Sequence, residues 1–311
     1  MSTDVPATVS TGPDRASVST LRAWAIASRP HTLTIGITPV LVGCSLAFAE
    51  TGHVDLWLML MSMLGALLLQ AGTNLDNDVS DFQRGTDRAG RLGLPRATAL
   101  GLLTPLQVRS ASRLCFLVAT VIGLLLSWRG GWPIFVAGLA SAAAALAYSG
   151  GPRPISYTPF GDFVVWLFFG LVAVSGTYYL QTLTIDPAVL IAATMVGLPA
   201  AAVLVVNNYR DLDPDRAVGK RTLAVCLGRG FSRAQYATLM LAPFALLLSF
   251  GLATHVGMAL AVPLIALPMA LNLVHGFRHE TPGPAFNGLL ARTAQFQVVF
   301  AVLFCIAILL G

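Results

Sequence analysis

The chain has 311 residues, of which 56% are hydrophobic and only 11% are charged, and its mean hydropathy is +0.75. Because soluble domains carry about 25% charged residues, this composition excludes an ordinary soluble protein and predicts an integral membrane protein surrounded by lipid. The net charge of +5 reflects where the basic residues lie relative to the membrane, so we expect no nucleic-acid partner.

The predicted elements begin with a polar tail. Residues 1–21 are rich in Ser, Thr, Pro and Asp and lack the apolar core of a signal peptide. We expect them to form a disordered cytoplasmic tail, followed by a single membrane domain over residues 22–311.

Nine apolar segments of that domain are long enough to cross the hydrocarbon core, which requires about 20 residues. They are expected at residues 32–50, 56–77, 109–127, 131–149, 160–180, 188–207, 233–252, 255–275 and 291–310. The predicted fold is therefore all-α: a polytopic membrane protein with nine transmembrane helices in one bundle.

The basic residues indicate how this bundle lies in the membrane. Of the 19 basic residues, all but Arg129 fall on one side if the segments alternate in direction. Short loops rich in Lys and Arg face the cytoplasm. We therefore expect a cytoplasmic N-terminus and an external C-terminus in a bacterial cytoplasmic membrane. An even number of helices would scatter the basic residues over both sides.

Half of the 14 acidic residues lie in two short stretches, each at the cytoplasmic end of an apolar segment. The stretches are TNLDNDVSDFQRGTD (73–87) and VVNNYRDLDPDRAVGKRT (205–222). Both contain the spacing Asn-x3-Asp, as Asn77 and Asp81 and again as Asn207 and Asp211, which places the polar side chains of each stretch on one helix face. Because they lie four helices apart, the pattern indicates a weak repeat of two four-helix units plus a ninth helix.

These acidic residues are placed where a helix disfavours them. Negative charge at a carboxyl end opposes the helix dipole, and like charges one turn apart repel, so we expect a cation to relieve the repulsion. Carboxylate and amide oxygens without Cys or His suit Mg²⁺, which is often shared with substrate phosphates. The predicted metal ligands are Asn77, Asp81 and Asp87 for one ion, and Asp211 and Asp215 for a second.

Two alternatives remain open at this point. The spacing does not decide between Asn77 and Asp78 as a ligand, and a solvated helix cap could also carry such acids. Basic residues within the same stretches, Arg84, Lys220 and Arg221, are predicted to contact phosphate oxygens. The segment GKRT lacks the first glycine and the preceding strand of a nucleotide-binding P-loop, which excludes an ATPase of that kind.

Several stretches resemble the UbiA superfamily of intramembrane aromatic prenyltransferases. They are SRPHTLTIGITPVLVG (28–43), NDVSD (77–81), YSGGPRPISYTPFGD (148–162), FFGLVAVSGTYYLQT (168–182), NNYRDLDPDRAVGKRTLAV (207–225) and LLARTAQ (289–295). The resemblance extends from about residue 22 onward and is strongest to the branch that prenylates 1,4-dihydroxy-2-naphthoate. Two positions depart from it. Gly85 stands where the common motif has its third acid, which arrives at Asp87, and His31 stands where this branch typically has Lys.

The resemblance implies a reaction. A polyprenyl group passes from an allylic diphosphate to 1,4-dihydroxy-2-naphthoate with loss of CO₂ and diphosphate, which gives demethylmenaquinol in menaquinone biosynthesis. Mg²⁺ is the implied cofactor, because it neutralises the departing diphosphate. The implied catalytic residues are Asp81, Asp211, Asp215 and Tyr148, whose ring face would meet an allylic cation. Arg153, which ends the stretch YSGGPR, would hold the carboxylate of the aromatic acid or assist the diphosphate. Arg29 and Asn74 are further candidate contacts of the aromatic acid by their positions.

Competing functions share some of these features. Other acceptors, namely 4-hydroxybenzoate, homogentisate or haem, would use the same mechanism. A secondary transporter usually carries its charges near the bilayer midplane on broken helices, whereas these acids gather at one face. A CDP-alcohol phosphotransferase would need an Asp-Gly-x2-Ala-Arg pattern, which the sequence lacks.

Overall fold

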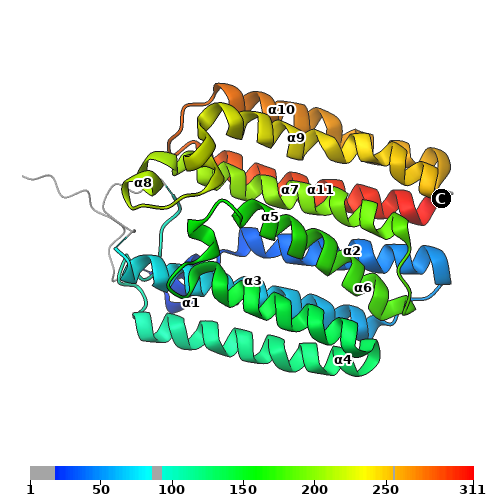
Figure 1. Cartoon of the computed structure of the whole chain (residues 1–311), viewed down its shortest axis with the longest axis horizontal. Helices are drawn as coiled ribbons and strands as arrows, with labels where there is room; N and C mark the ends of the chain where they lie inside the picture. Colours follow the sequence, from blue (N-terminus) through cyan, green and yellow to red (C-terminus); the bar gives the residue numbers. More distant parts are fainter. Residues whose placement is uncertain (1–17, 86–92, 255) are drawn as a thin grey trace, which may run out of the picture.

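The computed structural model describes residues 18–85, 93–254 and 256–311, and over these residues it contains helices and no strand. Most of the predicted tail and residue 255, the first of one predicted helix, lie outside the described residues. The long helices run side by side along the longest axis of the molecule (Figure 1). The predicted all-α class is therefore confirmed.

The helices have the following bounds: α1 Thr20–Ser28, α2 Pro30–Thr51, α3 Leu56–Gln83, α4 Pro105–Ser149, η2 Ile155–Tyr157, α5 Gly161–Val165, η3 Trp166–Val172, α6 Ala173–Thr182, α7 Pro187–Arg210, α8 Leu212–Ala217, α9 Leu223–Ala253, η4 Gly257–Ala266, α10 Leu267–His279 and α11 Phe286–Leu310. The segments α5, η3 and α6 follow one another directly and form one span, as do η4 and α10.

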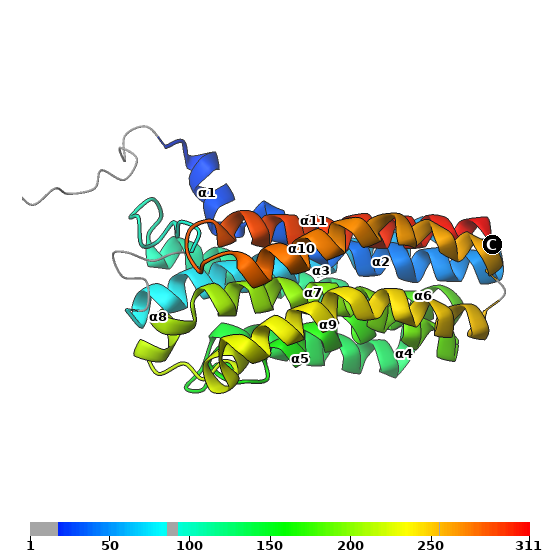
Figure 2. The same ribbon diagram turned by 90° about the horizontal axis from the view of Figure 1, so that it is seen from above.

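The short helix α1 meets α2 at a sharp corner, so that α1 stands at an angle to the bundle (Figure 2). Arg29 has the left-handed backbone angle φ 53°, which ends α1, and Pro30 begins α2. Proline suits the first position of a helix because its fixed φ is already helical and that position needs no N–H partner. The corner brings Arg29 to the same end of the molecule as the carboxyl end of α3.

The helix α4 is 45 residues long and would extend about 70 Å if it were straight. Instead, Arg109 near its start donates a hydrogen bond to Gln83, and the carbonyl of Ser149 at its end accepts one from Arg84. Gly131 inside it has the non-helical angles φ 65° and ψ −156°. Because the start and the end both contact the same turn of α3, the chain reverses at Gly131 into two antiparallel arms.

Eight helices of the described residues are long and apolar enough to cross a membrane, where nine were predicted. The difference arises at α4, which contains both predicted segments, 109–127 and 131–149, as one element with a reversal in it. The chain is an integral membrane protein, but the count of nine helices is not confirmed.

The interior of the bundle is built around α7, whose most apolar window is 72% buried, against 11% for the corresponding window of α3. Small residues allow helices to approach closely here. A side chain added at Gly197 of α7 would place its Cβ 2.8 Å from the Cα of Gly170 in η3. Large apolar side chains on the outer surface, such as Leu117 and Leu252, are well exposed, as expected for a surface that faces lipid.

Candidate active site

The two acidic stretches meet at one lysine. The Nζ atom of Lys220 lies 3.9 Å from Oδ1 of Asp81, at the end of α3, and 3.3 Å from Oδ1 of Asp215, in α8. Both carboxylates are buried, with 4% and 9% of each residue exposed. The two stretches therefore face each other at the same end of the bundle, 134 residues apart along the chain by their numbering.

The charges of this cluster shift one another's pKa values. Burial alone would lower the pKa of Lys220, but the attraction of Asp81 and Asp215 outweighs it and the pKa is raised. Burial raises the pKa of Asp215 to about 6, although the Lys220 ammonium opposes this shift. An ammonium group thus occupies the position between two carboxylates where a cation is held.

Asp81 has a second cationic partner. The Nη2 atom of Arg96 lies 2.8 Å from Oδ2 of Asp81, and 5% of Arg96 is exposed. The neighbouring Asp78 accepts hydrogen bonds at 3.0 Å from the backbone N–H groups of Ala97 and Thr98. The end of α3 therefore holds the segment that carries Arg96 through a buried carboxylate.

The surroundings of Asn77 and Asp78 differ in the structure. Asn77 lines the cavity described below, whereas Asp78 does not and is fully buried against the backbone of the 96–98 segment. Asn77 therefore lines the cavity together with Asp81, whereas Asp78 holds the 96–98 segment against α3.

The second stretch is organised by Arg210, the last residue of α7. Its guanidinium bonds to both carboxylate oxygens of Asp211, at 2.8 and 2.6 Å. It also donates to the side-chain oxygens of Asn207 and Asn287, each at 2.6 Å. Only 2% of Arg210 is exposed, so this cation is an integral part of the site.

The oxygen donors present are chemically suited to a hard divalent cation. Carboxylates of Asp81, Asp211 and Asp215, the first two flanked by the amides of Asn77 and Asn207, line one cavity, whose wall also includes His31. Within the described ranges, no three His, Cys, Asp or Glu side chains are grouped closely enough to hold a metal ion. The predicted ligand Asp87 lies outside the described residues. The position of Lys220 between two of these carboxylates supports a cation site here.

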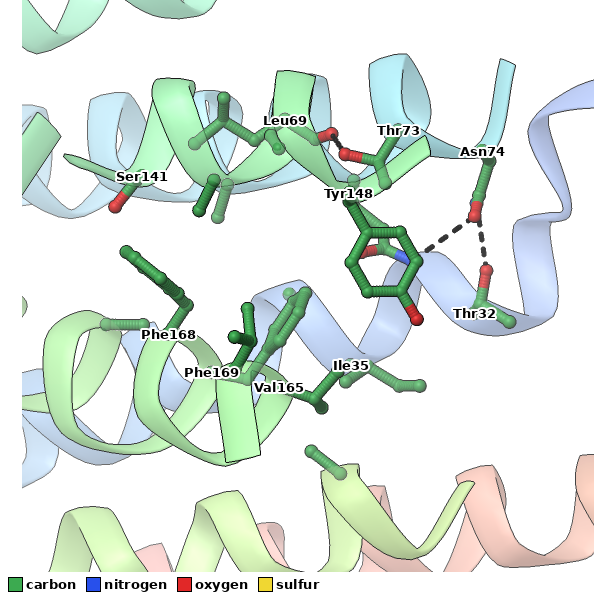
Figure 3. A pocket seen from close by; sticks show the side chains of 18 of the residues that line it. Thr32, Ile35, Leu69, Thr73, Asn74, Ser141, Tyr148, Val165, Phe168 and Phe169 are labelled. Carbon is green, nitrogen blue, oxygen red and sulfur yellow. Dashed lines mark hydrogen bonds between the residues drawn. The ribbon is translucent and has the colours of Figure 1, made fainter. Parts of the chain in front are cut away.

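A cavity of about 490 Å³ extends from these charged groups into the bundle, within the size range of small-molecule sites. Tyr148 projects into it from the last turn of α4, facing apolar side chains of α2 and the α5–α6 span (Figure 3). Those labelled in the figure are Ile35, Val165, Phe168 and Phe169. Charged groups at one end and apolar side chains further in thus line one continuous space.

Two predicted contacts of the aromatic acid lie at the corner between α1 and α2. Arg29 and Asn74 both line the cavity. The amide nitrogen of Asn74 donates to the carbonyl of Ser28 at 2.8 Å. It also donates to Oγ1 of Thr32 at 3.0 Å (Figure 3). Asn74 therefore fastens the corner that carries Arg29 to α3, beside its position at the cavity.

Three of the predicted binding residues do not line the cavity. Arg84 donates to the carbonyls of Ser149 and Gly151, at 2.7 and 2.9 Å. Arg153 and Arg221 are exposed. None of these three side chains is among the residues that line the cavity in the part of the chain that the structure describes.

The sequence pattern predicts only an orienting role for the positive charges of Arg96 and Arg210, yet both side chains line the cavity and pair with buried acids. The available signal was local for Arg210, which directly precedes Asp211 in an otherwise apolar helix. No comparable signal marked Arg96, because its partner Asp81 lies in a different element.

The bundle, its charged mouth and its apolar interior define a membrane prenyltransferase class. The family model of the UbiA prenyltransferase family matches residues 36–289, and the chain belongs to this family. The family expected from the sequence is thereby confirmed.

Several relatives within the family share one name. The 1,4-dihydroxy-2-naphthoate octaprenyltransferase of Escherichia coli (strain K12) is 32% identical, over 94% of this chain and 97% of the relative. The protein of that name from Mycobacterium leprae (strain TN) is 36% identical, over 90% and 93%. A UbiA homolog from Archaeoglobus fulgidus, solved bound to DMAPP and Mg²⁺, has the same fold with a TM-score of 0.65 at 16% identity, covering 92% of this chain and 99% of that one.

Proposed function

We propose that this chain transfers a polyprenyl group from an allylic diphosphate to 1,4-dihydroxy-2-naphthoate, releasing CO₂ and diphosphate and giving demethylmenaquinol for menaquinone biosynthesis. The names of the relatives support this reaction. The observation that carries it is the meeting of Asp81 and Asp215 at Lys220, at the mouth of an apolar cavity.

Asn77, Asp81 and Asp87 would hold one Mg²⁺, and Asp211 and Asp215 a second. Mg²⁺, when bound, supplies positive charge that stabilises the departing diphosphate. The chain's own cations Lys220, Arg96 and Arg210 already lie at this mouth. They are placed to bind phosphate oxygens once metal ions share the carboxylates with them.

The remaining predicted phosphate contacts, Arg84 and Arg221, lie beside this cluster. Tyr157 contacts both Arg84 and the cluster, because Nζ of Lys220 lies 4.8 Å and Cζ of Arg84 lies 5.2 Å from the centroid of its ring. The backbone N–H of Arg221 donates to the carbonyl of Tyr157 at 2.9 Å. Their proposed role is to hold the loop that carries Lys220 and to attract the diphosphate electrostatically.

The cavity interior suits the second half of the reaction. An allylic cation must meet the aromatic acceptor before it meets water, and apolar walls exclude water. The ring face of Tyr148 attracts such a cation, by roughly 0.5–2 kcal/mol. Arg29, at the cavity wall, is our proposed partner for the carboxylate of the acceptor, and the exposed Arg153 would draw that acid toward the mouth.

The basic residues and α4 support a proposal for the orientation in the membrane. We propose that the two arms of α4 each cross the membrane, which gives nine crossings from eight long helices and two four-helix units plus a ninth helix. The N-terminus and the active site then face the cytoplasm and the C-terminus faces outward, in a bacterial cytoplasmic membrane. Residues 22–311 would form one domain.

The test is an assay with the purified full chain, Mg²⁺, a radiolabelled polyprenyl diphosphate and 1,4-dihydroxy-2-naphthoate. We expect a prenylated product and release of CO₂. Asp81→Asn should reduce turnover by about 10²-fold or more, as for loss of other electrostatic catalytic groups. Asp213→Asn is the matched control, because the side chain of Asp213 is 68% exposed in the same motif. Product formed only with 4-hydroxybenzoate or homogentisate would contradict the proposed acceptor.

A further inference from the structure

A further buried carboxylate lies close to the cavity but outside both acidic stretches. Asp162 is in the first turn of α5, and only 7% of it is exposed. Its Oδ1 accepts a hydrogen bond from Nδ2 of Asn208 in α7 at 3.3 Å, and its Oδ2 accepts one from Nε2 of Gln235 in α9 at 2.8 Å. Two other helices thus contribute a neutral amide to one carboxylate.

These contacts fix the direction of both amide groups. An ionised carboxylate only accepts hydrogen bonds, so each amide must present its N–H to Asp162 and its carbonyl oxygen away from it. Asn208 lines the cavity, whereas Asp162 and Gln235 do not. The Asp162 carboxylate therefore lies behind Asn208 as seen from the cavity. It binds the amide nitrogen of Asn208, so the amide oxygen points away from Asp162.

The adjacent Asn207 provides a contrast. Its Oδ1 accepts a hydrogen bond from Nη2 of Arg210 at 2.6 Å, so that this oxygen is occupied within the acidic stretch. Asn208, one residue further along α7, has its nitrogen engaged by Asp162 and its oxygen left for another donor. The two neighbouring asparagines thus differ in which side-chain atom is bonded: the oxygen of Asn207 accepts from Arg210, and the nitrogen of Asn208 donates to Asp162.

An acid in the first turn of a helix also stabilises that helix through its dipole. That role needs no partner from α7 or α9, so it does not account for the two amides. Asn208 and Tyr148, whose ring is proposed to meet the allylic cation, both line the cavity.

Building on the proposed function, we propose that Asp162 is a positioning residue: it holds the carbonyl oxygen of Asn208 toward the cavity, where this oxygen accepts a hydrogen bond from a ring hydroxyl of the aromatic acceptor. A phenolic hydroxyl that donates to such an oxygen shifts electron density into its ring, which favours attack by the ring carbon on the cation. The ring is also held in one orientation.

Kinetics of the full-length enzyme test this inference. Asp162→Asn removes the fixed direction of the Asn208 amide, because the new amide can either donate or accept. We expect its KM for 1,4-dihydroxy-2-naphthoate to rise roughly tenfold, the value of one hydrogen bond, with the KM for the polyprenyl diphosphate unchanged. Asn208→Leu should likewise raise the KM for the acceptor and leave the KM for the diphosphate unchanged. In the double variant with Asp162→Asn, the acceptor KM should rise little further. The matched control is Asp186→Asn, an acid that caps α7 at its other end through Ala188.

A second measurement does not depend on how well the Asp162 variant folds. Each monomethyl ether of the acceptor lacks one hydroxyl donor. The wild-type enzyme should use one of these ethers much less well than the parent acceptor, whereas Asn208→Leu should lose that discrimination.

Equal rises in both KM values, or an unchanged acceptor KM in both Asp162→Asn and Asn208→Leu, would overturn the positioning role. Equal discrimination against the ether by the wild type and Asn208→Leu would also overturn it. Failure of the wild type to prenylate 1,4-dihydroxy-2-naphthoate would instead refute the proposed function, so the two failures are distinguishable.

Discussion

Replacing Lys220 with methionine removes the cation between Asp81 and Asp215 while keeping the length of the side chain. At 3.3 and 3.9 Å, each attraction amounts to roughly 4 to 5 kcal/mol at an effective dielectric constant of about 20. Much of this offsets the cost of removing the charges from water. The net loss of stability in metal-free protein is therefore expected to be about 3–5 kcal/mol, as for other buried pairs that lose one partner.

The pH dependence of this loss has a definite sign. Burial already raises the pKa of Asp215 to about 6 despite the opposing charge of Lys220, so the variant should raise this pKa further. A carboxyl group whose pKa is raised by folding binds its proton more tightly in the folded state, and its destabilising effect grows as pH rises through that pKa. The loss of stability of Lys220→Met relative to wild type should therefore become smaller as the pH is lowered from about 7.5 to about 5.5.

The assay is thermal unfolding of detergent-purified protein with a chelator, repeated with Mg²⁺. We expect a lower midpoint for Lys220→Met without metal, partly restored by acid or by Mg²⁺. Arg216→Met is the matched control, because the side chain of Arg216 is 59% exposed and lies 4.0 Å from an exposed Asp213. Equal midpoints for wild type and Lys220→Met at about pH 7.5 would refute the electrostatic reasoning.

Three further predictions concern other parts of the fold. Asp78→Leu should destabilise the protein by about 2 kcal/mol or more, because two buried backbone N–H groups at Ala97 and Thr98 lose their acceptor; an unchanged unfolding midpoint would contradict this. Gly197→Ala should cost about 1–3 kcal/mol by overpacking against η3, whereas Gly123→Ala, which has open space around its added carbon, should not; equal midpoints would show that the helices can separate freely. Chelation of divalent ions from the wild-type enzyme should abolish turnover reversibly, as measured by readdition of Mg²⁺; full activity in the chelator would exclude the proposed metal.

The sequence predicted those parts of the site whose residues belong to one helical stretch. Asn77 and Asp81 share one helix face because they are four residues apart in α3, and the convergence of the two stretches on Lys220 agrees with a site at one end of the bundle. Repulsion within the two stretches is smaller than the sequence predicts, because Arg96, Arg210 and Lys220 already neutralise much of the negative charge.

Contacts between distant segments could not be predicted in this way. The bonds of Asp162 to Asn208 and Gln235 span 46 and 73 residues, and no periodicity reports such distances. The same limit applies to α4, where hydropathy shows two apolar segments but does not show that a single glycine joins them without a loop. Side-chain direction is decided by packing, which explains why Arg84 turns to backbone carbonyls instead of toward the cavity.

The ammonium of Lys220 also has a consequence for how a metal ion and a diphosphate would bind together. In the proposed site, a divalent ion that bound alone would share Asp81 and Asp215 with this positive charge and would therefore bind weakly. A diphosphate arriving with the ion would offer the ammonium another anion and free the carboxylates. Each ligand would then raise the affinity for the other by the same factor, so we expect such an enzyme to stay sparsely loaded with metal until its substrate is present.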